Sequence, residues 1–203
     1  MNSLYKKPIS IRFEHLLQVT ESNSFLEMQG LNNEIPFFIF PYQPQEQNEI
    51  MAMCTLLCKR LASEGIAVLN INLYDLTIDI LKKQGVWESI LEQETSFTKK
   101  ELMEDLQSSL NPEHHLAPAI SSKIENESFD ILFLTGIGEV FPYIRSHNIL
   151  NNLQSTAKTF PTLIWFPGEY TFTPEGGSSL DLFGLLHDDK YYRAFNILEY
   201  QLG

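Results

Sequence analysis

The 203-residue chain, with 43% hydrophobic and 20% charged residues, has enough apolar material to bury one substantial core, which excludes an intrinsically disordered chain. Its 14 Lys and Arg residues stand against 26 Asp and Glu residues, giving a formal net charge of −12. Because the phosphate backbone of nucleic acids is also negative, we expect no strong direct nucleic-acid binding, whereas a basic protein partner would be attracted.

The first third of the chain predicts two helices alternating with two strands. An amphipathic helix opens at Ser10, and the apolar run at residues 36–42, bounded by prolines, predicts a short strand. Residues 46–63 place their apolar side chains on one helical face, and residues 66–74 then form a second apolar strand. A strand, a helix and another strand in succession indicate parallel pairing of the two strands.

The middle of the chain predicts a helical insertion and then a third strand. Asp75 is expected to cap a helix, while Thr98 and Glu101 have the spacing of a capping box that opens another. A short helix at residues 118–126 leads into the strand at residues 130–135.

The last part of the chain completes an α/β pattern. It predicts a helix around residues 149–153, a fourth strand at 161–167, a loop at 171–179 and a terminal helix at 191–198. We therefore expect one α/β domain over residues 1–203, with a mostly parallel central sheet of about four or five strands, helices on both faces and a helical insertion.

The sequence also bears on the location of the protein and the state of its cysteines. Its N-terminal residues lack the apolar stretch of a signal peptide, and no later segment approaches membrane-spanning length, so we expect a cytoplasmic protein without membrane association. Cys54 and Cys58 are four residues apart in a helical pattern, where a disulfide would be strained. We expect them to be buried thiols.

Common cofactor motifs are absent from the sequence. No segment has the glycines followed by Lys and Ser or Thr that form a phosphate-binding P-loop. Gly136 and Gly138 follow a predicted strand, but Phe141 occupies the third glycine position of the dinucleotide-binding motif and Pro142 delays the helix. We therefore expect no cofactor.

The ends of the predicted strands supply a candidate functional crevice, because the loops at the carboxyl ends of parallel strands converge there. Glu139 and Glu169 could form a carboxylate pair for magnesium binding or acid/base catalysis, and Arg145 or His147 could complete that site. Carboxylates in such positions also cap helices or neutralise arginines, so a structural role is the favoured interpretation and an enzyme site is the alternative. With Thr135, these residues form the candidate crevice.

Aromatic residues near the C-terminus provide a candidate partner contact. Tyr and Arg are common anchors of protein interfaces, and Tyr170, Tyr191, Tyr192 and Arg193 combine the two. Base stacking is a weaker alternative for these side chains, since the sequence lacks the basic groove of single-strand binders.

Several segments spread over most of the chain resemble the BrxB family of bacteriophage-exclusion (BREX) systems. Together they are specific because they occur in the order and at the intervals of the family. The matching segments are residues 37–42 (FFIFPY), 72–75 (NLYD), 133–142 (FLTGIGEVFP), 144–147 (IRSH), 150–153 (LNNL), 166–170 (FPGEY) and 191–195 (YYRAF).

The resemblance implies a component encoded beside a DNA methyltransferase, a large ATPase and PglZ, a protein similar to alkaline phosphatases. Because those proteins hold the evident chemistry, the resemblance implies a non-catalytic adaptor or scaffold, with the PglZ-like protein as its first expected partner. It brings no established catalytic residues to this chain. The alternative function is a divergent nucleotide-binding or metal-dependent phosphoester enzyme that uses Glu139, Glu169 and His147.

Overall fold

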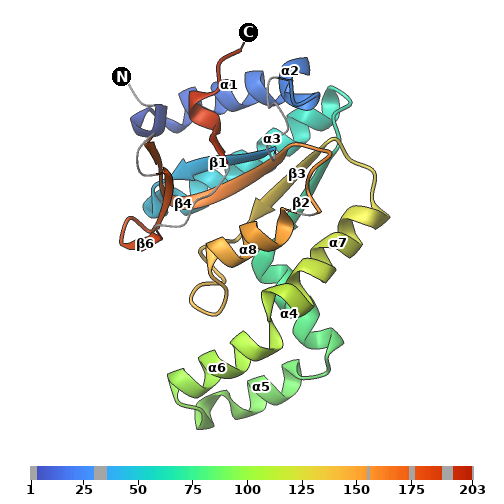
Figure 1. Cartoon of the computed structure of the whole chain (residues 1–203), viewed down its shortest axis with the longest axis vertical. Helices are drawn as coiled ribbons and strands as arrows, with labels where there is room; N and C mark the ends of the chain where they lie inside the picture. The colour runs from blue at the N-terminus through green and yellow to red at the C-terminus, as the bar shows by residue number, and fades with distance from the viewer. Residues whose placement is uncertain (1–3, 30–35, 155, 174–176, 189–193, 203) are drawn as a thin grey trace.

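A computed structural model describes residues 4–29, 36–154, 156–173, 177–188 and 194–202. Its centre is a sheet in which five strands run parallel in the order β2-β3-β4-β1-β7 (Figure 1). These strands are β1 (Phe37–Tyr42), β2 (Val68–Asn72), β3 (Ile131–Thr135), β4 (Thr162–Thr173) and β7 (Phe195–Asn196). The predicted α/β class with a mostly parallel sheet is confirmed. The predicted pairing of β1 with β2 is wrong, because β3 and β4 lie between them in the sheet.

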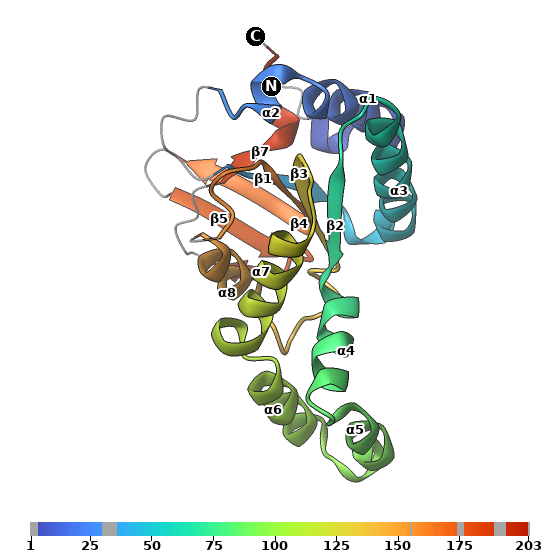
Figure 2. The same ribbon diagram turned by 90° about the vertical axis from the view of Figure 1, so that its right-hand side faces the viewer.

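Alternating side chains on the strands enter two separate cores, one on each face of the sheet. On β1, Phe38 and Phe40 enter the core against α1 (Ile9–Thr20) and α3 (Gln47–Ser63). Their neighbours Phe37 and Ile39 enter the opposite core. That core is covered by α4 (Leu73–Lys83), α7 (Ala117–Asn126) and α8 (Ser146–Leu153) (Figure 2). Helices therefore cover both faces, as the sequence predicts.

Short helices connect these elements. They are η1 (Leu4–Lys6), α2 (Asn23–Leu26), η2 (Pro44–Glu46), η4 (Pro112–Leu116) and η5 (Ile197–Glu199). No helix within the described residues is both long enough and apolar enough to cross a membrane. On α3, Cys54 is buried and Cys58 is half-buried, and both are free thiols.

The boundary between β2 and α4 differs from the sequence prediction. Asn72 caps α4, because its Oδ1 accepts hydrogen bonds from the backbone N–H groups of Tyr74 at 2.8 Å and Asp75 at 3.2 Å. The helix therefore begins at Leu73, and the predicted cap at Asp75 is wrong. A short asparagine side chain that reaches the first free N–H groups ends the strand, while the buried Leu73 is compatible with either element.

The predicted helical insertion is present as an arm that extends away from the sheet in both views (Figures 1 and 2). We use the name arm for residues 87–109, which form α5 (Trp87–Gln93), η3 (Glu94–Ser96) and α6 (Lys99–Ser109). The predicted capping box opens α6: Thr98 Oγ1 accepts from Glu101 N at 3.3 Å, and Glu101 Oε2 accepts from Thr98 N at 2.8 Å.

The C-terminal third corrects two predictions. Instead of ending near Pro167 and entering a loop, β4 continues to Thr173 and pairs antiparallel with β5 (Gly177–Leu182), which in turn pairs with β6 (Leu186–Asp188). The terminal helix predicted at residues 191–198 is wrong over its described part. Residues 195–196 form a strand that pairs with β1, and a 3-10 helix follows. Both differences arise from backbone pairing between strands, which the local pattern of apolar residues does not report.

Candidate functional site

The loop at residues 136–145 leaves β3 and enters α8 at the edge where the carboxyl ends of the parallel strands meet. Gly136 lets this loop begin close to α4, because its backbone has φ +76° and a Cβ placed on it would lie 2.7 Å from Asn72 Oδ1. That oxygen caps α4. Only a residue without a side chain allows both the turn and the cap.

On one side, the 136–145 loop is joined to β1 and α3 through a chain of hydrogen bonds. The Gln47 side chain donates from Nε2 to Glu139 Oε1 at 3.0 Å and accepts from the Tyr42 hydroxyl through Oε1. Tyr42 is buried, whereas Glu139 is exposed. Burial raises the pKa of Tyr42 well above its usual value, and the nearby Glu139 carboxylate raises it further. The network therefore requires a neutral Tyr42.

Alkaline pH is expected to weaken this network. Since the folded protein holds the Tyr42 proton more tightly than the unfolded chain, its contribution to stability is complete below about pH 10 and is lost as the pH rises above that value. Tyr42→Phe should therefore flatten the fall of the unfolding free energy between about pH 10 and 11, measured by urea unfolding. An unchanged slope in the variant would contradict the prediction.

On the opposite side, the loop is joined to α4 through Tyr143. Its hydroxyl donates to the backbone oxygen of Glu139 at 3.3 Å. Burial raises the pKa of Tyr143, and the side chain of Thr77 opposes that shift. Because Thr77 belongs to α4, the phenol lies beside that helix. Tyr74, also close to Tyr143, keeps 42% of its surface exposed. An aromatic side chain of α4 is therefore displayed next to the loop.

The turn between β5 and β6 packs on the same loop. The Phe183 ring lies beside Gly138, where a Cβ would approach it to 2.9 Å, and contacts the Phe141 ring edge-on with centroids 6.1 Å apart. Phe183 itself has φ +60°, an uncommon backbone conformation for a bulky residue. Its ring is thereby directed onto the loop, while Leu185, two residues later, remains 85% exposed.

Of the predicted crevice residues, Thr135 is buried and His147 is only 6% exposed. The Thr135 hydroxyl donates to Asn70 Oδ1 on the neighbouring strand at 3.3 Å, so it joins β3 to β2. His147 is the second residue of α8 and packs inside the protein, whereas Arg145, immediately before the helix, is exposed. Arg145 and Glu139 are the members of the set that the loop displays to solvent.

Glu139 and Glu169 are both exposed, but their carboxylates raise the pKa of different tyrosines. Glu139 acts on Tyr42 and Tyr143, whereas Glu169 lies on β4 and, with Glu46, raises the pKa of Tyr5 beyond the effect of burial. Within the described residues, no three His, Cys, Asp or Glu side chains are grouped so that they could hold a metal ion.

The predicted partner-contact residues divide into two groups. Tyr170 is 7% exposed, and its hydroxyl donates to the backbone oxygen of Ala194 at 2.6 Å. Its ring belongs to the core on the α8 face, so the side chain fastens the C-terminal segment to the sheet. Tyr191, Tyr192 and Arg193 lie outside the residues that the structure describes.

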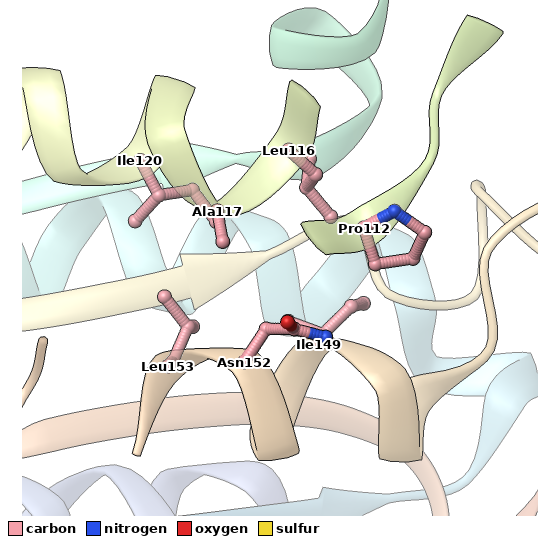
Figure 3. A pocket seen from close by; sticks show the side chains of 7 residues that line it. All are labelled: Pro112, Leu116, Ala117, Ile120, Ile149, Asn152 and Leu153. Atoms are coloured by element: carbon pink, nitrogen blue, oxygen red, sulfur yellow. The ribbon is translucent and has the colours of Figure 1, made fainter. Parts of the chain in front are cut away.

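A shallow depression lies elsewhere, between η4, α7 and α8 (Figure 3). Its walls are almost entirely apolar, with Leu116 and Ile120 on the η4 and α7 side and Leu153 on the α8 side. The space between them does not admit a water molecule. It is a packing seam between two helices, far too tight for a nucleotide.

Sequence reasoning missed three residues that build the site: Gln47, Tyr143 and Phe183. Gln47 and Tyr143 bond to Glu139 from different elements, and Phe183 arrives from a hairpin that was not predicted. A usable signal was present only for Phe183, because the Phe-Gly pair at residues 183–184 lies between two apolar leucines and is compatible with a hairpin turn. The Gln47 bond depends on a contact between residues distant in the chain, whereas the Tyr143 bond to Glu139 depends on the fold of the loop that holds both.

Fold and site together define an acidic α/β domain whose sheet edge carries an internally bonded loop. Comparison with known proteins identifies the family: the model of the family described as BREX protein BrxB matches residues 69–197. A BREX protein BrxB of Bacillus cereus (strain H3081.97) is 32% identical over 195 residues, covering 94% of this chain and 98% of that protein. Another, from Escherichia coli O9:H4 (strain HS), is 28% identical over 191 residues, covering 94% and 92%.

The chain therefore belongs to the BrxB family, and its role is in BREX phage defence. No solved structure matches it. The segments that suggest the family in the sequence are structural in large part: residues 133–142 form β3 and the 136–145 loop, and residues 166–170 form the part of β4 that passes from parallel to antiparallel pairing.

Proposed function

We propose that this chain is a non-catalytic adaptor of its BREX system, acting in the cytoplasm, and that it binds the PglZ-like protein of the same system. The contact surface is the 136–145 loop with the turn between β5 and β6. One observation supports this above all: the polar groups of the loop bond to one another and to the surrounding elements, so the loop is held in place as a platform.

The platform displays the side-chain types that anchor protein interfaces. Arg145 and Tyr74 are exposed next to the loop, and Leu185 is exposed on the turn that packs on it. Arg and Tyr are enriched among interface residues that dominate binding energy, and an exposed leucine can be buried by a partner. The rigid support limits the entropy lost on binding.

Co-expression of this chain with its PglZ-like neighbour tests the proposal. Size-exclusion chromatography with light scattering, at two salt concentrations, should show a complex of defined stoichiometry. Comigration that weakens with salt would assign a role to the acidic surface. Separate elution at both concentrations would overturn the proposed partner, and magnesium and nucleotide binding to the isolated chain would then be measured to test the phosphoester-enzyme alternative.

Arg145→Ala is expected to weaken this complex about tenfold, as typical for an interface anchor. The fold should be unaffected because the Arg145 side chain is exposed and makes no capping bond to α8. Arg60→Ala, at an exposed position on α3, serves as the matched control and should bind like wild type. Isothermal titration calorimetry measures the affinity of both variants for the PglZ-like protein. Equal affinities would show that Arg145 does not contribute to the interface.

A further inference from the structure

The arm, residues 87–109, has no buried residue, although it contains seven large apolar side chains. Trp87, Ile90 and Leu106 are partly buried against the core on the α8 face. The other four are Leu91, Phe97, Leu102 and Met103, and none of them belongs to either core or packs against one. Leu91 is 47% exposed. The arm therefore carries apolar surface that the body of the protein does not cover.

The arm is nevertheless held at its base in a defined orientation. Gln84 Nε2, at the end of α4, donates to the backbone oxygen of Ser109 at 2.9 Å, and Gln107 Nε2 reaches the backbone oxygen of Pro142 in the 136–145 loop at 3.5 Å. Helices of seven and eleven residues are marginal on their own in water and gain most of their stability from packing. A partner that covers the arm would supply the burial that the body does not.

The charge of the arm determines what kind of partner fits. It holds six carboxylates and two lysines, a net charge of −4, and Leu91 lies one turn after Glu88 on α5. Nucleic acid and an anionic lipid surface would be repelled by this charge. A second copy of the chain would bring the same acidic arm and a further net charge of −12. A basic protein surface with an apolar centre is complementary.

We propose that the arm is a docking element for a basic surface of another protein of the same BREX system, with Leu91 buried at the centre of the contact and the carboxylates of the arm around it. The inference rests on the proposed adaptor function and extends it by naming a second contact region and the chemistry of the surface that binds it. The Gln107–Pro142 contact joins the arm to the loop of the first region.

The test compares two arm variants with matched controls in the full chain. Leu91→Ser removes the apolar centre, and its control is Leu56→Ser on α3, where the leucine is 46% exposed. The double variant Glu92→Lys with Glu94→Lys reverses two charges near the end of α5, where positive charge suits the helix dipole. Its control is Glu49→Lys with Glu64→Lys, two exposed carboxylates of α3 and its C-cap.

Each variant is co-expressed with all the other proteins of the system, purified through a tag, and its bound partners are quantified at low and high salt. Unchanged far-UV circular dichroism and melting temperature establish that the variants fold. We expect both arm variants to lose at least tenfold in affinity for one BREX protein, and the charge variant to lose most of the salt dependence, while both controls bind like wild type.

The outcomes separate this inference from the proposed function. Arm variants that bind the PglZ-like protein like wild type, and retain every other BREX partner, would overturn the arm as a docking element and leave the adaptor function standing. Arm-dependent binding of a different BREX protein would support the arm and overturn the PglZ assignment. Absence of any complex with wild type would overturn both, and arm-dependent dimers of the chain alone would overturn the basic partner.

Discussion

Glu46→Gln is expected to lower the free energy of unfolding by about 2–3 kcal/mol, because it leaves the buried Arg12 guanidinium without its counter-charge. Arg12 is completely buried on α1 and forms an ion pair with Glu46, whose side chain is 25% exposed. Glutamine keeps the shape and an acceptor oxygen, so the capping bond to the Gln43 backbone can persist. Urea unfolding followed by circular dichroism measures the effect.

Replacing the other partner of the ion pair, Arg12, should lower the free energy of unfolding much less. Arg12→Met removes the buried charge, and the Nε and Nη1 groups of Arg12 have no hydrogen-bond partner to lose. Glu46, being partly exposed, can then be hydrated, so we expect a change within about 1 kcal/mol. The double variant Arg12→Met with Glu46→Gln should be more stable than Glu46→Gln alone, because it contains no buried unpaired charge. A loss for Arg12→Met as large as that for Glu46→Gln would show that the pair itself is strongly stabilising.

Gly168→Ala is expected to destabilise the protein by about 3 kcal/mol, because the new methyl group meets backbone that cannot move independently. Gly168 lies where β4 passes from its parallel to its antiparallel partner. A Cβ there would lie 2.1 Å from the backbone oxygen of Asp181, its near neighbour on β5. Relief of the clash requires the β4–β5 pairing to open.

Gly65→Ala provides the control for this prediction. Gly65 has φ +82° but nothing within 4 Å of a Cβ, so its replacement carries only the backbone strain, about 1 kcal/mol. Urea unfolding of both variants should rank Gly168→Ala as clearly more destabilising. Equal losses would indicate that the β4–β5 hairpin tolerates the methyl group, and that Gly168 is not required by packing.

An opened hairpin would also affect the proposed interface. Phe183, in the turn that follows β5, packs against Gly138 and Phe141 of the 136–145 loop. Gly168→Ala should therefore weaken binding of the PglZ-like protein as well as stability, although Gly168 itself is buried. Arg145→Ala should weaken binding without the loss of stability, and this difference separates a contact residue from a residue that supports the contact.

The site was accessible from the sequence only in outline. Glu139 and Arg145 were assigned to the strand-end edge because they follow a strand whose apolar run is unambiguous, and the structure displays both of them there. Thr135 and His147 were assigned by the same reasoning but are buried. Position after a strand indicates the edge of the sheet, whereas the direction of each side chain depends on the helix or loop that packs over it.

The sequence by itself determined the α/β class, the parallel strands β1 to β3, the long helix α3 and the capping box of α6, since each depends on hydrophobic periodicity or on bonds between residues three or four positions apart. It also determined the family, because the matching segments extend along most of the chain. Only the tertiary structure decided that β4 continues into a hairpin, that residues 195–196 join β1, and that Tyr170 faces inward. These features result from backbone pairing and burial, which for residues 195–196 and Tyr170 involve residues distant in the chain; the backbone hydrogen bonds and packing override local propensity.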